Sequence, residues 1–156
     1  VQKQSEYLVK SLKSKGVGIL EVNLYDLCVD LIKERNLWDK LLEMEKGWEK
    51  DKFGNQLRNL IDVSEKMIPE ISKRIEQTNG LQILLLTGVG QIYPFIRTHS
   101  VLNNLQRVAK DYPTLLFFPG EYTFNEGRGQ SLDLFGVLNE DKYYRAFNIM
   151  EYKLPS

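Results

Sequence analysis

The sequence is poor in the residues that build metal and redox centres, because it holds one cysteine, Cys28, and one histidine, His99. A single cysteine excludes an intramolecular disulfide, and the pair cannot supply a thiolate cage or a two-histidine metal site. Cys28 also falls on an apolar helical stripe, which is typical of a small core residue. We therefore expect neither a metal nor another cofactor.

The sequence also lacks an excess of positive or negative charge, and it has no long hydrophobic run. Lysine and arginine total 21, aspartate and glutamate total 21, and each half of the chain is balanced. The chain therefore lacks the basic bias that marks sequence-independent binding to a phosphate backbone. No segment approaches the roughly 18 uncharged apolar residues of a membrane span, so we expect a cytoplasmic protein without membrane contact.

The composition that remains is globular, with 42% hydrophobic, 27% charged and 11% aromatic residues. We expect one α/β domain over residues 1–156, without repeats or linkers. Apolar runs predict strands at residues 17–22, 81–87, 114–118, 132–138 and 143–150, and the 81–87 run is typical of a central strand covered on both faces. Residues 121–130 are polar and glycine-rich and are interpreted as a loop.

Helical periodicity fills the intervals between these strands. A short amphipathic helix is predicted at residues 5–15, and Asn23 is placed to cap a second helix with a buried stripe from Leu24 to Ile32. Three apolar faces between residues 37 and 75 predict a helical middle segment, and Asn79-Gly80 predicts its end. The 81–118 region reads as strand, helix and strand, a unit whose two strands pair in parallel.

The turn after the 81–87 strand is the most suggestive spot for chemistry. Gly88 and Gly90 imitate a phosphate-binding loop, but the lysine and the Ser/Thr that such a loop needs are absent, and the preceding strand ends without an acidic residue for magnesium. Two readings stay open for the glycines: a tight turn that needs positive φ, or backbone N–H groups that bind phosphate. Two readings also stay open for Arg97 and His99. His99 is a hydrogen-bonded structural residue near a helix start, or the two side chains together bind an anion or a carboxylate of a partner.

Seven segments together resemble the BrxB family of the BREX bacteriophage-exclusion systems. In order along the chain they are NLYDL at 23–27, LTGVG at 86–90, YPFIR at 93–97, HSVLNNL at 99–105, FFPGEY at 117–122, LDLFG at 132–136 and DKYYRAF at 141–147. The resemblance implies a divergent P-loop-type α/β sandwich without Walker motifs, with a mostly parallel central sheet. It also implies a further N-terminal segment.

By the same resemblance, the expected function is that of a non-catalytic adaptor in a phage-defence complex. The implied partners are a PglZ-type protein, the methyltransferase and other BREX subunits, and the family has no catalytic residues to carry over. The alternative is a module that binds nucleotide or nucleic acid in the crevice around residues 88–97. The candidate residues for partner or anion binding are Gly88, Gly90, Gln91, Tyr93, Arg97, His99, Glu121, Tyr122, Arg128 and Arg145.

Overall fold

The computed structural model describes residues 2–125, 129–134, 138–139 and 146–151. Contacts within the chain divide it into two compact units, residues 1–117 and 118–156, which we describe separately. The expectation of one domain over the whole chain stays a prediction.

A parallel three-stranded sheet forms the centre of the first unit, with the strand order β1-β2-β3. Leu20 pairs with Leu84, and Leu84 pairs with Thr114, and all neighbours run in the same direction. The predicted central strand is confirmed, because Leu84, Leu85 and Leu86 are fully buried. The bounds are Ile19–Asn23 for β1, Ile83–Thr87 for β2 and Thr114–Leu116 for β3.

The strand predicted at 114–118 is shorter and more exposed than expected. It ends at Leu116, and its residues are half-buried or exposed. The reason is its position at the edge of the sheet, where only β2 pairs with it. The parallel pairing of this strand with its neighbour is confirmed.

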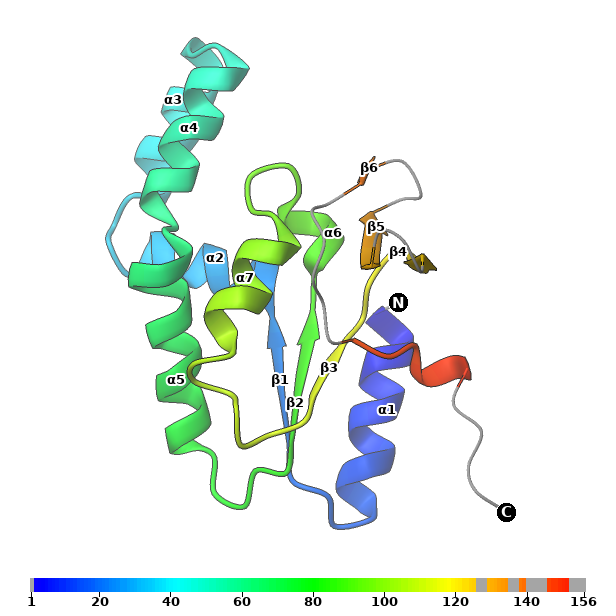
Figure 1. Ribbon diagram of the computed structural model, residues 1–156. Coiled ribbons are helices and arrows are strands. Elements are labelled where there is room, and N and C mark those ends of the chain that lie inside the picture. The colour runs from blue at the N-terminus through cyan, green and yellow to red at the C-terminus, as the bar shows by residue number, and fades with distance from the viewer. Residues whose placement is uncertain (1, 126–128, 135–137, 140–145, 152–156) are drawn as a thin grey trace. The chain divides into compact units, whose positions relative to one another are not determined.

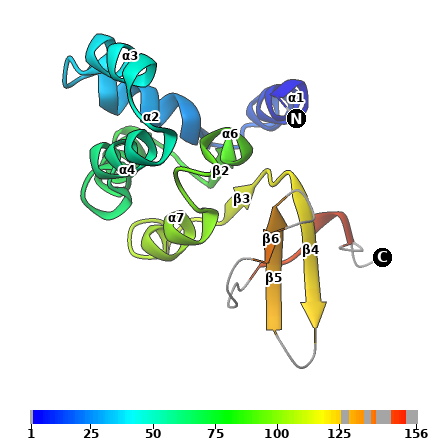
Figure 2. The same cartoon turned by 90° about the horizontal axis from the view of Figure 1, so that it is seen from above.

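Helices lie on both faces of this sheet. In Figures 1 and 2, α1 and α2 lie behind it and α7 lies in front. The predicted stripe on α2 is confirmed, since its residues Leu24, Leu27, Cys28, Leu31 and Ile32 are all buried. The bounds are Gln2–Ser14 for α1, Leu24–Lys33 for α2, Val89–Ile92 for α6 and Thr98–Leu105 for α7.

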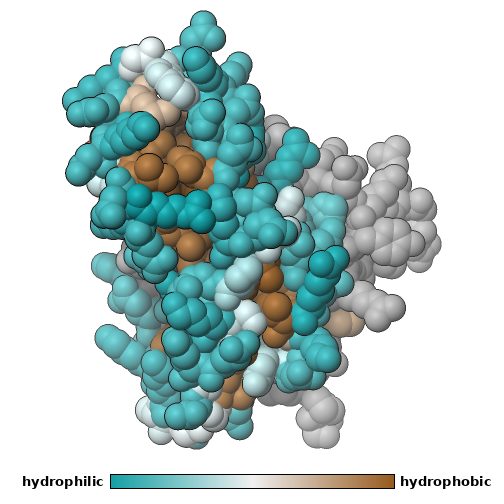
Figure 3. Space-filling model, turned by 90° about the vertical axis from the view of Figure 1, so that its left-hand side faces the viewer, coloured by the Kyte–Doolittle hydropathy of each residue, from teal (hydrophilic) through white to brown (hydrophobic). Residues whose placement is uncertain are grey.

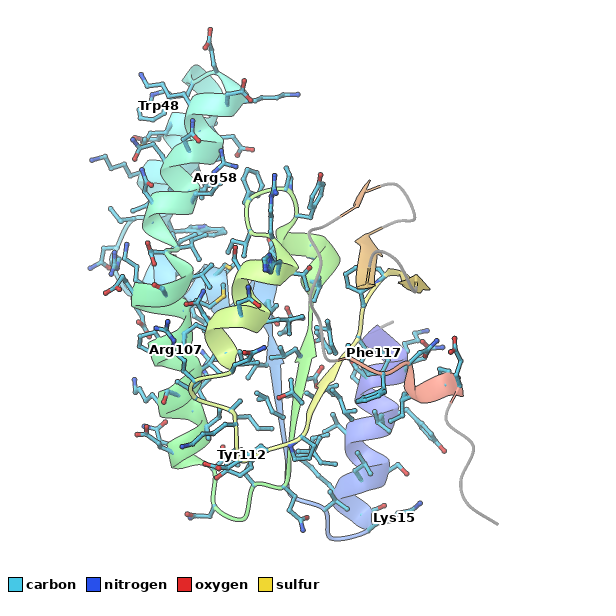
Figure 4. All side chains as sticks on the ribbon, in the orientation of Figure 1. Lys15, Trp48, Arg58, Arg107, Tyr112 and Phe117 are labelled. Carbon is cyan, nitrogen blue, oxygen red and sulfur yellow. The ribbon has the colours of Figure 1, made fainter. Side chains whose placement is uncertain are left out.

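The predicted helical middle segment is confirmed and begins with a hairpin of two helices, α3 and α4, that extends beyond the C-terminal ends of the strands (Figure 1). The charged stretch at residues 43–52 spans its tip, where Trp48 lies (Figure 4). A π-helical turn then leads into α5, whose second residue is Pro69. Proline has no N–H to donate to the preceding turn, so a change of helical geometry at this point is expected. The bounds are Trp38–Gly47 for α3, Lys50–Leu60 for α4, Val63–Met67 for η1 and Ile68–Gln77 for α5.

The second unit contains an antiparallel sheet with the order β4-β5-β6. The loop expected at 121–130 was wrong, because β4 and β5 pair there as a hairpin. The strand expected at 132–138 is interrupted, since β5 ends at Leu134 and β6 folds back on it. Residues 140–145 lie outside the described residues, and the rest of the strand expected at 143–150 ends in a 3-10 helix. The bounds are Gly120–Asn125 for β4, Gly129–Leu134 for β5, Leu138–Asn139 for β6 and Ile149–Glu151 for η2.

Candidate functional site

The turn at Gly88 connects β2 to the short helix α6. Gly88 has φ of 78°, a conformation that L residues with a side chain rarely adopt. A Cβ atom built there would overlap Oδ1 of Asn23 and lie 3.1 Å from the backbone nitrogen of Tyr25. The glycine is therefore required by backbone conformation and by close packing, which confirms the tight-turn reading for Gly88. Gly90 lies inside α6 without a positive φ, so that reading does not hold there.

Asn23 fills the space beside Gly88 because it caps α2. Its Oδ1 accepts hydrogen bonds from the N–H groups of Tyr25 at 2.9 Å and Asp26 at 3.3 Å, as the sequence predicts. The positive end of α2 is thus satisfied by the chain's own amide.

The segment after α6 packs its apolar residues against the helical hairpin. Phe95 lies against Gly54 of α4, where an added Cβ would stand 3.4 Å from Cε1 of the phenyl ring. Ile92 and Ile96 are buried, while Tyr93 is half-buried. Gly54 in the middle of a helix costs about 1 kcal/mol relative to alanine. A Cβ atom at this position would make an ordinary van der Waals contact with Phe95, so the phenyl ring limits the size of a larger side chain and does not by itself require glycine.

An apolar pocket of about 230 Å³ opens between α2, α3, α4 and the segment that begins with α6. Two of its hydrophobic side chains are well exposed, Leu42 at 44% and Tyr25 at 41%. In Figure 3 hydrophobic side chains gather over the hairpin end of the molecule, within a hydrophilic surround. The lining consists of Tyr25, Cys28, Val29, Ile32, Trp38, Leu41, Leu42, Glu45, Phe53, Leu57, Ile61, Gln91, Ile92, Phe95 and Ile96.

A second pocket of about 240 Å³ lies on the other side of the same segment, and we call it the arginine pocket. Arg58 of α4 and Arg97 at the start of α7 both line it, and Figure 4 shows Arg58 on the hairpin beside the connection between α6 and α7. The complete lining is Arg58, Ile61, Asp62, Val63, Pro94, Phe95, Ile96, Arg97 and Ser100.

The fold places only some of the candidate residues predicted from the sequence near one another. Gly88, Gly90, Gln91, Tyr93 and Arg97 share one segment, but Gln91 lines the apolar pocket and Arg97 lines the arginine pocket. The His99 ring Nε2 is hydrogen-bonded to the Asn103 amide on α7. Glu121 and Tyr122 belong to β4 in the second unit, and Arg128 and Arg145 lie outside the described residues.

Arg58 and Ser100 were missed as functional candidates. Each belongs to a helical region with ordinary local composition, and the contact that joins them spans about forty residues of sequence. No local motif signals such a long-range contact. Only the expectation that the helical middle covers one end of the sheet could have raised Arg58 as a candidate.

Groups with catalytic potential are sparse in the part of the chain that the structure describes. There, no three His, Cys, Asp or Glu side chains gather in a way that could hold a metal ion. Burial raises the pKa of the Cys28 thiol to about 12, so the thiol stays protonated at neutral pH. Thr87 is buried, and its hydroxyl donates to Glu21 Oε1 at 3.2 Å, which joins β2 to β1. None of the described helices is both long and apolar enough to cross a membrane.

Comparison with known proteins gives consistent matches. The family model described as BREX protein BrxB matches residues 20–149. BREX protein BrxB of Bacillus cereus (strain H3081.97) is 31% identical over 155 residues, which cover 97% of this chain and 77% of the relative. BREX protein BrxB of Escherichia coli O9:H4 (strain HS) is 26% identical over 150 residues, which cover 96% of this chain and 71% of the relative. No solved structure matches the chain. The family match spans most of the sequence, and this chain therefore belongs to the BrxB family.

Proposed function

We propose that this BrxB protein is a non-catalytic adaptor that joins subunits of a BREX phage-defence complex, with a PglZ-type protein as its direct partner. Membership in the family makes it a BREX component. The methyltransferase and other subunits would be held through the same complex in the cytoplasm.

The observation that carries the proposal is the apolar pocket between α2, α3 and α4. Hydrophobic side chains of this kind are enriched where proteins bind one another, since their burial provides most of the free energy of association. Leu42 and Tyr25 contribute large exposed areas, and Gln91 adds a polar group that can donate and accept. A partner side chain that enters this pocket would remove all three from water.

The state of the chain's single cysteine supports an adaptor rather than an enzyme. The thiol of Cys28 is buried and protonated, so it is not placed as an activated nucleophile. The alternative, a nucleotide- or nucleic-acid-binding module that uses the glycines at 88 and 90, is less well supported. The close packing of Asn23 against Gly88 already accounts for the glycine at this position, and the lysine and Ser/Thr of a phosphate-binding loop are absent.

The test is copurification of this chain with the PglZ-type protein from cells that express both. The wild-type chain should retain the partner at micromolar concentrations, and Leu42→Lys should weaken retention at least about tenfold, because it would bury a charge in the pocket. Tyr7→Lys is the matched control, since Tyr7 is a 76% exposed aromatic residue on α1 outside the pocket.

Each outcome of this experiment has a separate meaning. If the wild-type chain fails to copurify, the adaptor function is wrong. If Leu42→Lys and Tyr7→Lys both retain the partner as the wild type does, the adaptor function stands and the apolar pocket is not the interface. If both variants lose the partner, the surface as a whole is involved and the pocket has no special role.

A further inference from the structure

The arginine pocket brings two positively charged side chains together. Arg58 and Arg97 come from separate elements, and both side chains are exposed in the pocket. Among the residues that the structure describes, neither guanidinium pairs with a carboxylate. Within the described part of the chain, Arg58 donates a side-chain hydrogen bond only to Asn55 on its own helix. Two cations at one pocket repel each other unless an anion lies between them.

The acidic group in this lining does not offset the charge of the two arginines. Asp62 accepts the N–H of Glu65 through Oδ1 at 2.9 Å, which makes it the cap of the π-helical turn. Two guanidinium groups and one carboxylate leave a net charge of one positive unit in the lining. A guanidinium has five donors in a fork and binds phosphate oxygens in a bidentate manner.

The start of α7 adds to this preference for an anion. Arg97 occupies the N-cap position, where Ser, Thr, Asp or Asn would normally accept a helix N–H, and a guanidinium cannot accept. A positive side chain at the positive end of a helix is also electrostatically unfavourable. An anion bound beside Ser100, in the first turn, would reverse both effects.

The rest of the pocket is apolar and small. Ile61, Phe95 and Ile96 line it beside the charged groups and offer a surface to a short carbon body. Its volume of about 240 Å³ is below the usual range for small-molecule sites, which begins at about 300 Å³, so only a small group such as a phosphate with a short carbon body would fit. The balanced charge of the whole chain is unlike that of proteins that bind a nucleic-acid backbone. We propose that the arginine pocket binds the phosphate group of a small molecule, independently of the adaptor function.

The experiment is calorimetric titration of the full chain at constant ionic strength with three probes. These are inorganic phosphate, a nucleoside monophosphate and a short single-stranded oligonucleotide. Inorganic phosphate or the monophosphate should bind the wild type, and Arg58→Gln and Arg97→Gln should each weaken binding about tenfold by removing a charge-assisted hydrogen bond. Arg107→Gln is the matched control, because Arg107 is exposed beyond the opposite end of α7 (Figure 4) and does not line the pocket.

The outcomes separate the sources of phosphate. Unchanged affinity in Arg97→Gln, or equal weakening in Arg107→Gln, overturns the pocket as the site. Absence of binding by all three probes overturns the proposal altogether. Binding by the oligonucleotide alone, dependent on Arg58 and Arg97, overturns the small-molecule source and assigns the pocket to nucleic acid. Circular dichroism of each variant shows that the fold is retained.

Discussion

Asn23 Oδ1 occupies the position that a Cβ atom at residue 88 would need. The two residues lie at the C-terminal ends of neighbouring parallel strands, one at the last position of β1 and the other directly after β2. In an open α/β sheet this is the edge where ligands usually bind. Here the asparagine uses the available space to cap α2, so the edge serves packing at this point.

The first prediction tests this packing. Gly88→Ala should lower the free energy of unfolding by about 2–3 kcal/mol, because it adds backbone strain at positive φ and displaces a helix cap. Gly80→Ala is the control, since Gly80 has φ of 67° and open space around it, so only strain of about 1 kcal/mol applies. Urea unfolding measures both.

A double-mutant cycle then isolates the steric contribution. In an Asn23→Ala background the cap is already lost, and Gly88→Ala should cost little more than Gly80→Ala does. Equal costs of Gly88→Ala with and without Asn23 would contradict the close contact.

The second prediction concerns the contact between α4 and the segment after α6. Gly54→Ala should raise the free energy of unfolding by up to about 1 kcal/mol, because alanine favours the helix and its Cβ would make an ordinary contact with Phe95. Gly54→Leu should instead lower it by about 1–3 kcal/mol, since the longer side chain needs the space of the phenyl ring.

Gly47 provides the comparison for this pair of variants. It ends α3, and a Cβ there would meet nothing within 4 Å. Gly47→Leu should therefore be tolerated in thermal unfolding, and a loss as large as that of Gly54→Leu would show that the cost at residue 54 does not come from Phe95.

Sequence reasoning worked best where a local rule decides the structure. The uninterrupted run from Leu84 to Leu86 predicts a central strand, Asn23 predicts a cap, and the stripe on α2 predicts its buried face. All three are confirmed. These features need only periodicity and capping chemistry, which act over a few residues.

Two features were not predicted correctly from the sequence. The hairpin of β4 and β5 was read as a loop because its strands are rich in polar residues, although Tyr122 and Phe124 alternate with polar neighbours and glycines follow. The arginine pocket was not foreseen because Arg58 and Arg97 meet only through tertiary packing of the hairpin, for which a single sequence carries no signal.

The third prediction uses the thiol of Cys28. Its pKa of about 12 in the folded state and 9.0 in the unfolded state imply that at pH 8 the folded chain holds about a thousandfold less thiolate. Alkylation by iodoacetamide should therefore be slow in the native protein and fast in urea. Native labelling at the unfolded rate would contradict the burial of Cys28.

The same shift has a consequence for stability. The folded state holds the Cys28 proton more tightly than the unfolded state does. This difference adds to the free energy of unfolding in full below pH 9, and the added stability is lost as the pH rises from 9 toward 12. The free energy of unfolding should fall by about 1.4 kcal/mol per pH unit in that window. Cys28→Ala lacks the group, so its stability curve should be flatter than that of the wild type over the same pH range.

The fourth prediction concerns the two ion pairs of Arg74, one within α5 and one that joins α5 to α2. Arg74 Nε donates to Glu70 Oε1, and its NH2 group donates to Asp30 Oδ2, both at 3.1 Å. Partial burial alone would lower the pKa of Arg74, but the hydrogen bonds and charges of Glu70 and Asp30 outweigh it and raise that pKa. Arg74→Met keeps the apolar stem and should lower the free energy of unfolding by about 1–2 kcal/mol, because it leaves the mostly buried Glu70 with a weaker partner.

Neighbouring variants separate the contributions to this cluster. Asp30→Asn should cost only about 0.5 kcal/mol, since Asp30 is 51% exposed and solvent screens its pair. Lys73→Met is the control, because Lys73 is 60% exposed and lies 3.5 Å from Glu70, so its removal should change little. At high salt, the loss in free energy of unfolding should decrease more for Asp30→Asn than for Arg74→Met, because ions in solution screen mainly the exposed pair. Equal costs for Arg74→Met and Lys73→Met would mean that α5 is held to α2 by apolar packing alone.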